Sequence, residues 1–239
     1  MINKIVLSAA EAVADIRDGA TVMIGGFGTA GMPSELIDAL IEQGARDLTI
    51  VNNNAGNGDT GLAALLKAKR VRKIICSFPR QTDSLGLRRA VSRRRDRARA
   101  RAAGQSGRAH SRRRRGHRRV LHARPATARC SPRARRRARS TADSYVLEHP
   151  IHADFALIKA DRGDRWGNLV YRKTARNFGP IMASRSEVRD RAGARDRADL
   201  GGLDPETIVT PGIFVQRVVE AAGRRARRAA GSRTRTAEA

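Results

Sequence analysis

A glycine-rich loop is the part of this sequence best suited to hold an anionic group. Gly25, Gly26, Phe27, Gly28, Thr29, Ala30 and Gly31 lie between a short apolar run and a segment of helical periodicity. Glycine lets backbone N–H groups approach a ligand closely, and the dipole of a following helix favours negative charge. Such a loop could bind a phosphate or stabilise the oxyanion that develops during acyl transfer.

The same loop satisfies the dinucleotide-binding spacing G-x-G-x-x-G through Gly26, Gly28 and Gly31. That fingerprint also requires an acidic residue about 20 residues further on, at the end of the next strand, to bind the ribose. Here the next apolar run ends in Asn52-Asn53-Asn54. A dinucleotide-dependent oxidoreductase is therefore a disfavoured alternative. A tight turn with positive φ explains the glycines without any ligand.

Few other side chains are placed for chemistry. Asn53 and Asn54 follow the second apolar run, where they could contact a reacting carbonyl or simply cap the turn. Cys76 ends an apolar run with no base nearby to activate its thiol, so we expect it in the core. His149 and His152 form an HxxH pair without further ligands. We expect a structural role for that pair and no metal site.

The elements that position these residues alternate between strand and helix. Short apolar runs predict buried strands at Thr21–Ile24, Asp47–Val51 and Val71–Ser77. Helices are predicted after the capping box Ser8-x-x-Glu11, from Pro33 to a stop at Gly44, and over Leu62–Leu66. Further strands are expected at Tyr145–Leu147, Asp154–Lys159 and Leu169–Arg172, and the readable part closes with Ile208–Val215. The fold class is α/β, a Rossmann-like open, mostly parallel sheet with helices on both faces, which Tyr145 onward would complete.

The charge of the chain is concentrated in a few stretches. Leu85–Ala142 holds 22 arginines among 58 residues, with no lysine, no aromatic residue and Asp96 as its only acid, so it contributes +21 of the formal +26. Ser184–Leu200 and Ala221–Ala239 are also rich in arginine, and the remainder of the chain carries a net charge of −1. We expect a disordered Arg-rich segment interrupting one domain, 1–219, and a basic disordered tail over 220–239.

A resemblance to a known family covers about two-thirds of the chain. The 16 residues from Asp18 to Pro33, DGATVMIGGFGTAGMP, resemble the α-subunit (A-subunit) signature of family I, or 3-oxoacid, coenzyme A transferases: Asp-Gly, three apolar residues, Gly-Gly-Phe, then Gly-x-Pro. The likeness extends through residues 44–58, 71–84, 144–183 and 202–219. Ser77–Gln81 and Arg176–Ala183 look most like the A subunits that act on 3-oxoadipate. The succinyl-CoA:3-ketoacid (acetoacetate) enzymes remain an open alternative.

The resemblance implies a transferase that moves CoA from succinyl-CoA to a 3-oxoacid, as in the β-ketoadipate pathway of aromatic catabolism. A glutamate in a Ser-Glu-Asn-Gly motif of the B subunit carries CoA as a thioester, and no such motif occurs here. This chain would thus supply no catalytic nucleophile. Gly25–Gly31 would face CoA, and Asn53 and Asn54 would contact the substrate or oxyanion. The implied partner is a B subunit, in a heterodimer or heterotetramer. Coenzyme A and succinyl-CoA would be substrates, with no permanently bound cofactor.

The arginine-rich stretches depart from the family pattern, and we interpret 85–143 and 184–200 as frame-shifted. If GC-rich codons encode Gly107–His122, the same DNA read one base out of frame can give AERIRAAGAGIGAFF. The family has a segment of this kind at that place. The same one-base change of reading frame turns Asp190–Arg197 into IVQVREIV, a strand-like sequence. Alanine and glycine codons of such DNA become arginine codons, which accounts for the absence of lysine. A frame-shifted chain would fold incompletely and could be inactive.

In an alternative interpretation the arginines are correctly encoded, and the chain is a nucleic-acid-binding protein. An Arg-rich arm neutralises phosphates and folds on RNA, although the stretch Leu85–Ala142 has no aromatic residue for base stacking. We expect no specific nucleic acid partner. No run reaches the ~18 apolar residues that span a bilayer, and the N-terminus lacks a continuous apolar signal core. The expected setting is the cytoplasm, with no membrane partner.

Overall fold

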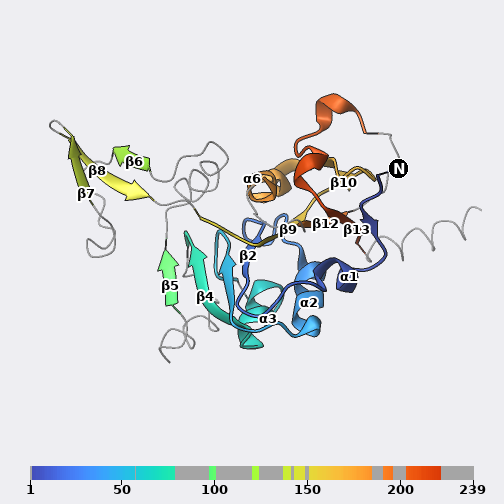
Figure 1. The fold of residues 1–239 in the computed structure, drawn as a ribbon, viewed down its shortest axis with the longest axis horizontal. Helices are drawn as coiled ribbons and strands as arrows, with labels where there is room; N and C mark the ends of the chain where they lie inside the picture. The colour runs from blue at the N-terminus through green and yellow to red at the C-terminus, as the bar shows by residue number, and fades with distance from the viewer. Residues whose placement is uncertain are drawn as a thin grey trace, which may run out of the picture.

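The computed structural model places a parallel sheet at the centre of the chain (Figure 1). Residues described in full are 2–56, 58–78, 151–184 and 203–221; for 97–100, 120–123, 137–140, 143–148 and 191–195 only the backbone strands are described. Within these residues the main sheet has eight strands, all parallel, in the order β1-β13-β12-β9-β2-β3-β4-β5. The bounds are β1 Ile5–Val6, β2 Thr21–Ile24, β3 Leu48–Val51, β4 Val71–Cys76, β5 Arg97–Ala100, β9 Phe155–Lys159, β12 Arg191–Arg195 and β13 Arg217–Glu220.

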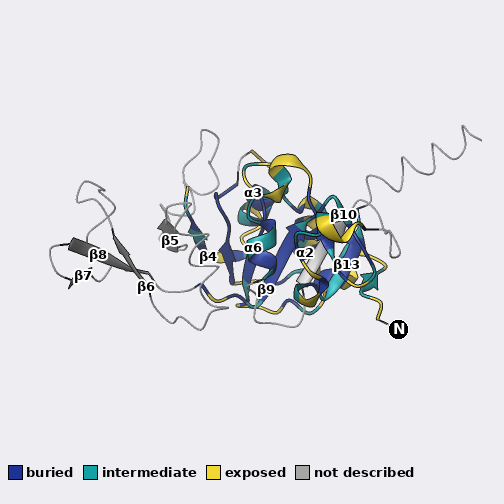
Figure 2. Cartoon of the chain, turned by 90° about the horizontal axis from the view of Figure 1, so that it is seen from above, coloured by how far each residue is buried: buried dark blue, intermediate teal, exposed yellow. Residues whose placement is uncertain are grey.

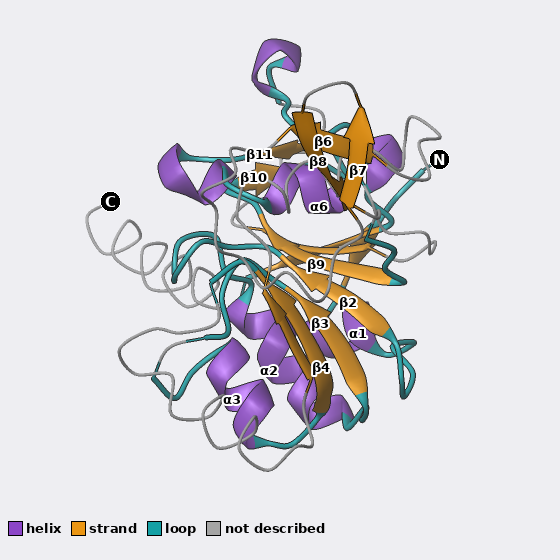
Figure 3. Ribbon diagram, turned by 90° about the vertical axis from the view of Figure 1, so that its left-hand side faces the viewer, coloured by secondary structure: helices purple, strands orange, loops and turns teal. Residues whose placement is uncertain are grey.

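Helices cover both faces of the sheet, as the sequence predicts (Figure 3). On one face lie α1 Ala9–Val13, α2 Ser34–Gln43 and α3 Leu62–Lys67, and on the other lies α6 Gly179–Ala183. Successive side chains of a strand point to opposite faces, so each buried strand supplies both cores. Val22 and Ile24 of β2 join the core beneath α1–α3, whereas Met23 joins the core beneath α6. Figure 2 shows these elements as the buried centre of the chain. Among the described residues, no helix is long and apolar enough to cross a membrane.

The predicted helix boundaries around α2 are confirmed. Pro33 takes the N-cap position, where a missing backbone N–H costs nothing. Gly44 ends the helix in the left-handed conformation with φ 97°, and its N–H donates to the carbonyl of Leu40 at 3.4 Å. The helix therefore turns its apolar residues onto the sheet, with Leu36, Ile37 and Leu40 fully buried.

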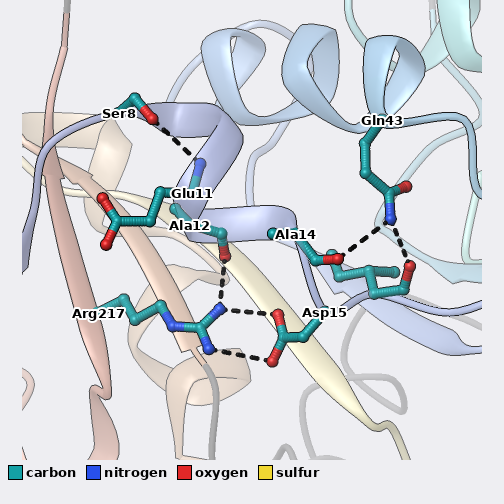
Figure 4. Close-up of polar contacts among 8 residues, drawn as sticks. Ser8, Glu11, Ala12, Ala14, Asp15, Gln43 and Arg217 are labelled. Atoms are coloured by element: carbon teal, nitrogen blue, oxygen red, sulfur yellow. Dashed lines mark hydrogen bonds and ion pairs between the residues drawn. The ribbon is translucent and has the colours of Figure 1, made fainter.

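The capping box at the start of α1 also forms. The Ser8 hydroxyl accepts the backbone N–H of Glu11 at 3.1 Å, and a Glu11 carboxylate oxygen accepts the N–H of Leu7 at 2.9 Å. The helix is shorter than its apolar periodicity suggests, because it ends at Val13. Ile16 is still buried, and its carbonyl accepts the Gln43 side-chain amide at 2.8 Å. Figure 4 shows the Ser8–Glu11 contact at the start of α1 and the contacts of the Gln43 amide beyond its end.

The last strand ties the two ends of the chain together. β13 pairs with β1 through Val218 opposite Ile5, and this strand has no counterpart in the sequence prediction. The Arg217 guanidinium forms a bidentate ion pair with Asp15, with Nη1–Oδ1 at 2.7 Å and Nη2–Oδ2 at 3.1 Å (Figure 4). Arg217 also donates to the carbonyl of Ala12 at 3.3 Å. This contact clamps β13 against the carboxyl end of α1.

The chain from Tyr145 onward completes the main sheet through β9, β12 and β13, as predicted, and only the strand around Tyr145 itself lies elsewhere. β8 Asp143–Glu148 does not complete the main sheet but pairs antiparallel with β6 Val120–Ala123 and β7 Arg137–Ser140. Figure 1 draws this three-stranded sheet to one side of the main body. β7 and β8 are consecutive strands, and the apolar run at 145–147 does not by itself specify which strands it pairs with. The strands predicted at 154–159 and 169–172 do form, as β9 and as β11 Leu169–Val170, which pairs with β10 Arg162–Gly163.

Backbone strands are described within the Arg-rich stretches. β5 pairs with β4 at one edge of the main sheet, and β12 lies inside it between β9 and β13. Arginine alternates with a small residue in RARA and RARS, and a two-residue period is a strand pattern. Backbone pairing needs no particular side chain, so the sheet keeps these positions filled. Our expectations for the tail at 220–239 lie outside the described residues beyond Ala221.

Candidate functional site

Three neighbouring parallel strands bring the predicted site residues to one edge of the sheet. β2 runs into Gly25, β3 into Asn52 and β4 into Ser77, and all three strands point the same way. Ligands of open α/β sheets bind beyond the carboxyl ends of such strands. The glycine loop, Gly25–Gly31, and the asparagines therefore converge, as the sequence analysis expects of a site.

The glycine loop folds as a small hairpin and not as a smooth entry into a helix. Phe27 and Ala30 exchange backbone hydrogen bonds of 3.0 and 3.2 Å, leaving Gly28 and Thr29 at the tip. α2 begins only at Ser34, so the loop does not itself form the first turn of that helix. Two of the loop's donors, the N–H groups of Phe27 and Ala30, are used inside this short local turn.

The remaining N–H groups of the loop are the ones available to a ligand. Within the described residues, the backbone N–H groups of Gly26, Gly28, Thr29 and Gly31 form no hydrogen bond. Gly28 has φ 62° and its Cβ position is open, with no atom within 4 Å. Open space next to unpaired donors is what a bound oxyanion or phosphate requires.

Two asparagines hold the loop in place from opposite sides. The Asn52 side-chain amide, 2% exposed, donates to the carbonyl of Ile24 at 2.6 Å and more weakly to that of Gly25 at 3.4 Å. The Asn177 amide donates to the carbonyl of Ala30 at 2.9 Å. Neither Asn52 nor Asn177 is among the site residues predicted from the sequence. Their signal is weak, since an asparagine that binds a backbone carbonyl far away in the chain leaves no local pattern.

The two predicted contact asparagines differ in their surroundings. The Asn53 Oδ1 accepts the hydroxyl of Ser77 at 2.8 Å, and its backbone carbonyl accepts the N–H groups of Ser77 and Phe78 at 3.1 and 3.0 Å. The Asn54 Oδ1 accepts the N–H of Gly56 at 2.8 Å, but its Nδ2 is buried without any hydrogen-bond partner. An unpaired buried amide costs free energy, about 1–3 kcal/mol. Asn54 therefore has a buried amide donor that no described residue uses.

The borders of this edge are apolar. Phe27 and Phe78 are 57% and 58% exposed, on the glycine loop and just after β4. Cys76, at the end of β4, is 1% exposed, and burial raises the pKa of its thiol to about 11, partly offset by a hydrogen bond with the Phe78 backbone. A thiol with a raised pKa is a poor nucleophile near neutral pH, in agreement with the core position predicted for Cys76.

Among the acidic residues of this region, Asp59 follows β3 in the chain and pairs with Lys67. Glu35 lies in the first turn of α2, and Asp164 uses its carboxylate to cap a turn through the N–H groups of Trp166 and Asn168 at 3.0 and 2.8 Å. In the part of the chain with described side chains, no group of three His, Cys, Asp or Glu residues could hold a metal ion. His149 lies outside the described residues, and His152 is exposed. The site offers hydrogen-bond donors and apolar surface.

Comparison with known sequences matches this chain to one family over most of its length. A sequence model described as coenzyme A transferase matches residues 6–106 and 128–221. The chain is 54% identical over 232 residues to the A subunit of 3-oxoadipate CoA-transferase from Pseudomonas putida, covering 93% of this chain and 96% of the relative. It is 32% identical over 223 residues to the A subunit of succinyl-CoA:3-ketoacid coenzyme A transferase from Helicobacter pylori J99, covering 90% and 91%.

Solved structures share the fold at low sequence identity. An acyl-CoA transferase from E. coli O157:H7, solved as a thioester complex with CoA, has a TM-score of 0.79 at 19% identity. The likeness covers 92% of this chain but only 47% of that protein, so this chain spans about half of its length. Glutaconate coenzyme A-transferase from Acidaminococcus fermentans has a TM-score of 0.75 at 16% identity, covering 91% and 75%. At these identities the likeness shows the fold alone, and it confirms the predicted fold class.

Proposed function

This chain belongs to the coenzyme A transferase family, and from that membership we propose that it is the A subunit of a 3-oxoadipate CoA-transferase. The reaction moves CoA from succinyl-CoA to 3-oxoadipate. Support comes from the 54% identity to the Pseudomonas putida protein, against 32–37% for relatives named for 3-ketoacids. Transfer to a 3-ketoacid such as acetoacetate is the second candidate, favoured by that lower but extensive similarity.

The observation that carries the proposal is a donor-rich edge without a nucleophile. The glycine loop presents unpaired N–H groups, and the Asn54 amide is buried and unpaired nearby. Donors of this kind stabilise the oxyanion of a tetrahedral intermediate, and their removal typically costs about 100-fold or more in kcat. A carboxylate must then come from elsewhere, so we propose that the partner is a B subunit, in a heterodimer or heterotetramer.

The proposed chemistry is a ping-pong exchange at this edge. The succinyl-CoA carbonyl carbon is attacked by a glutamate carboxylate of the B subunit, and the oxyanion that forms accepts hydrogen bonds from the loop. Expulsion of the CoA thiolate leaves a glutamyl–succinyl anhydride. The thiolate then attacks the glutamyl carbonyl, which releases succinate and leaves a glutamyl-CoA thioester. A carboxylate of 3-oxoadipate then attacks the glutamyl-CoA thioester, and the same steps in reverse order release 3-oxoadipyl-CoA and the free glutamate. CoA is thus a substrate, and no permanent cofactor is involved.

In this proposal the residues Gly25–Gly31 face the CoA thioester and Asn54 contacts the oxyanion, while Asn53 fixes the loop by holding Ser77. Replacing Asn54 with alanine should lower kcat about 100-fold with little change in KM, because the donor acts on the developing charge. The assay is CoA exchange by the complex with a B subunit. Replacing Asn53 should mainly lower stability. Equal loss of kcat in both variants would contradict the assignment.

We also propose that the stretches 85–143 and 184–200 are read out of frame in an otherwise single domain over 1–219. The family model skips residues 107–127, inside the first stretch, which supports this interpretation. β12 supports it too, because RAGAR occupies an interior position of a parallel sheet where strands are usually rich in Val, Ile and Leu. Resequencing the coding DNA tests the proposal. An uninterrupted frame that encodes the arginines would disprove it.

The proposed setting is the cytoplasm, consistent with the free thiol of Cys76. Neither a membrane nor a specific nucleic acid is part of the proposal. RNA binding by the arginines would follow from charge alone.

A further inference from the structure

The 3₁₀ segment η2, Lys173–Arg176, carries cations that the proposed chemistry does not use. Lys173 and Arg176 are both exposed, and neither forms an ion pair with a residue that the structure describes. Their neighbour Arg172 differs, since its Nε lies 3.7 Å from a carboxylate oxygen of Asp161. Lys173 and Arg176 are the first and last residues of this four-residue segment. The segment thus presents two unpaired positive charges together.

This segment is fixed against the glycine loop. Asn177, directly after η2, donates to the carbonyl of Ala30 at 2.9 Å. Gly31 packs so closely on η2 that a Cβ there would lie 2.8 Å from the carbonyl oxygen of Ala175 and 3.2 Å from its Cα. The two cations are therefore held beside the loop that faces CoA in the proposed function.

We infer that Lys173 and Arg176 bind phosphate groups of the acyl-CoA donor. This inference rests on the proposed function and adds a place for the charged end of the substrate. CoA carries a diphosphate and a 3′-phosphate, which stay hydrated at a protein surface, so exposed cations suit them. Lysine binds phosphate as a point charge and arginine as a two-pronged donor. The thioester would then reach past the glycine loop to the edge where Asn54 lies.

The acid substrate is the other source of anionic oxygens. Its carboxylates lie only a few bonds from the reacting carbonyl and would need a cation among the asparagines. Lys173 and Arg176 lie instead on the exposed segment η2, which packs against Gly31 of the loop. The geometry thus favours the phosphates, and the experiment can separate the two sources.

The test variant replaces Lys173 with glycine and Arg176 with alanine. Lys173 has φ 51°, a conformation that glycine adopts more readily, so the change removes charge without straining the fold. A matched control replaces Lys69 with glycine and Arg46 with alanine. Lys69 has φ 56° and is exposed, as is Arg46. The control residues precede β4 and β3, hence lie at the opposite edge of the sheet, and both variants remove two positive charges.

Equilibrium titrations of the full chain with CoA, with pantetheine and with succinate, near physiological salt, provide the measurement. We expect the test variant to bind CoA about tenfold more weakly, because two charge contacts are lost, and the control to change by less than about twofold. Pantetheine, which lacks phosphates, should bind all three proteins equally.

Each other outcome counts against the inference. Equal weakening in test and control variants would show attraction by overall charge, and unchanged CoA binding would place the phosphates elsewhere. Weakening confined to succinate would assign the cations to the acid substrate. If the unmodified chain binds neither CoA nor pantetheine, the proposed function fails as well. If it binds CoA and the two variants behave alike, only this inference fails.

Discussion

Replacing Gly31 with alanine tests how firmly η2 holds the glycine loop. Gly31 has φ 71°, where a residue with a side chain costs about 1 kcal/mol. The new Cβ would also lie 2.8 Å from the carbonyl oxygen of Ala175 and 3.2 Å from its Cα. These are backbone atoms, which cannot rotate away, and such overpacking costs about 1–3 kcal/mol. The free energy of unfolding should therefore fall by about 2–4 kcal/mol.

Gly28 in the same loop provides the control. Its φ is 62°, and a Cβ there would meet no atom within 4 Å. Alanine at this position pays only the conformational cost of about 1 kcal/mol. Urea unfolding followed by circular dichroism compares the two variants, with the slope m checking that the transition stays the same. If alanine lowers the free energy of unfolding equally at Gly31 and at Gly28, the loop does not pack on η2 as described.

The other predictions concern the clamp on α1, the buried thiol and the Arg-rich stretches. A double-mutant cycle that replaces Asp15 and Arg217 with alanine should give a coupling energy of about 1 kcal/mol in urea unfolding; additive losses would deny the ion pair. The pKa of Cys76 in the folded chain is about 11, above its ordinary value of 9.0. The stability that the neutral buried thiol contributes to the fold is therefore complete below pH 9 and is lost as pH rises from 9 to 11. Replacing Cys76 with alanine should remove about 2 kcal/mol of that pH dependence, and an unchanged profile between pH 9 and 11 would count against it. Rewriting 85–143 and 184–200 in the shifted frame should raise Tm in a thermal melt by several degrees or more; a lower Tm would oppose the frame hypothesis.

Local signals explain which parts of the fold could be predicted. The apolar run Thr21–Ile24 and the helix between Pro33 and Gly44 are defined by residues within the element, and both form as expected. β13 is not foreseen, because its pairing with β1 joins residues more than 200 positions apart. β8 pairs with the nearby strands β6 and β7 and not with the main sheet, because a local apolar run does not specify its partner strand. Local sequence thus predicts the elements better than their partners.

The candidate site shows the same division. The glycine signature correctly indicates a loop after β2, and the family resemblance is confirmed. The hairpin between Phe27 and Ala30 could not be foreseen, since the spacing of the glycines also fits a helix N-terminus. Asn177 is missed because it contacts the loop across 147 positions of sequence. Only the folded chain distinguishes Asn54, with its unpaired amide, from its neighbour.

The central claim is that this chain binds and orients the substrates while a partner carries the nucleophile. The most direct measurement is mass spectrometry of both proteins once the complex with a CoA-transferase B subunit, formed with the chain in its corrected frame, has been incubated with succinyl-CoA. The account predicts a CoA adduct on one glutamate of the B subunit, none on this chain, and loss of the adduct with formation of 3-oxoadipyl-CoA when 3-oxoadipate is added. A CoA adduct on this chain, or exchange without an adduct on the partner, would contradict it.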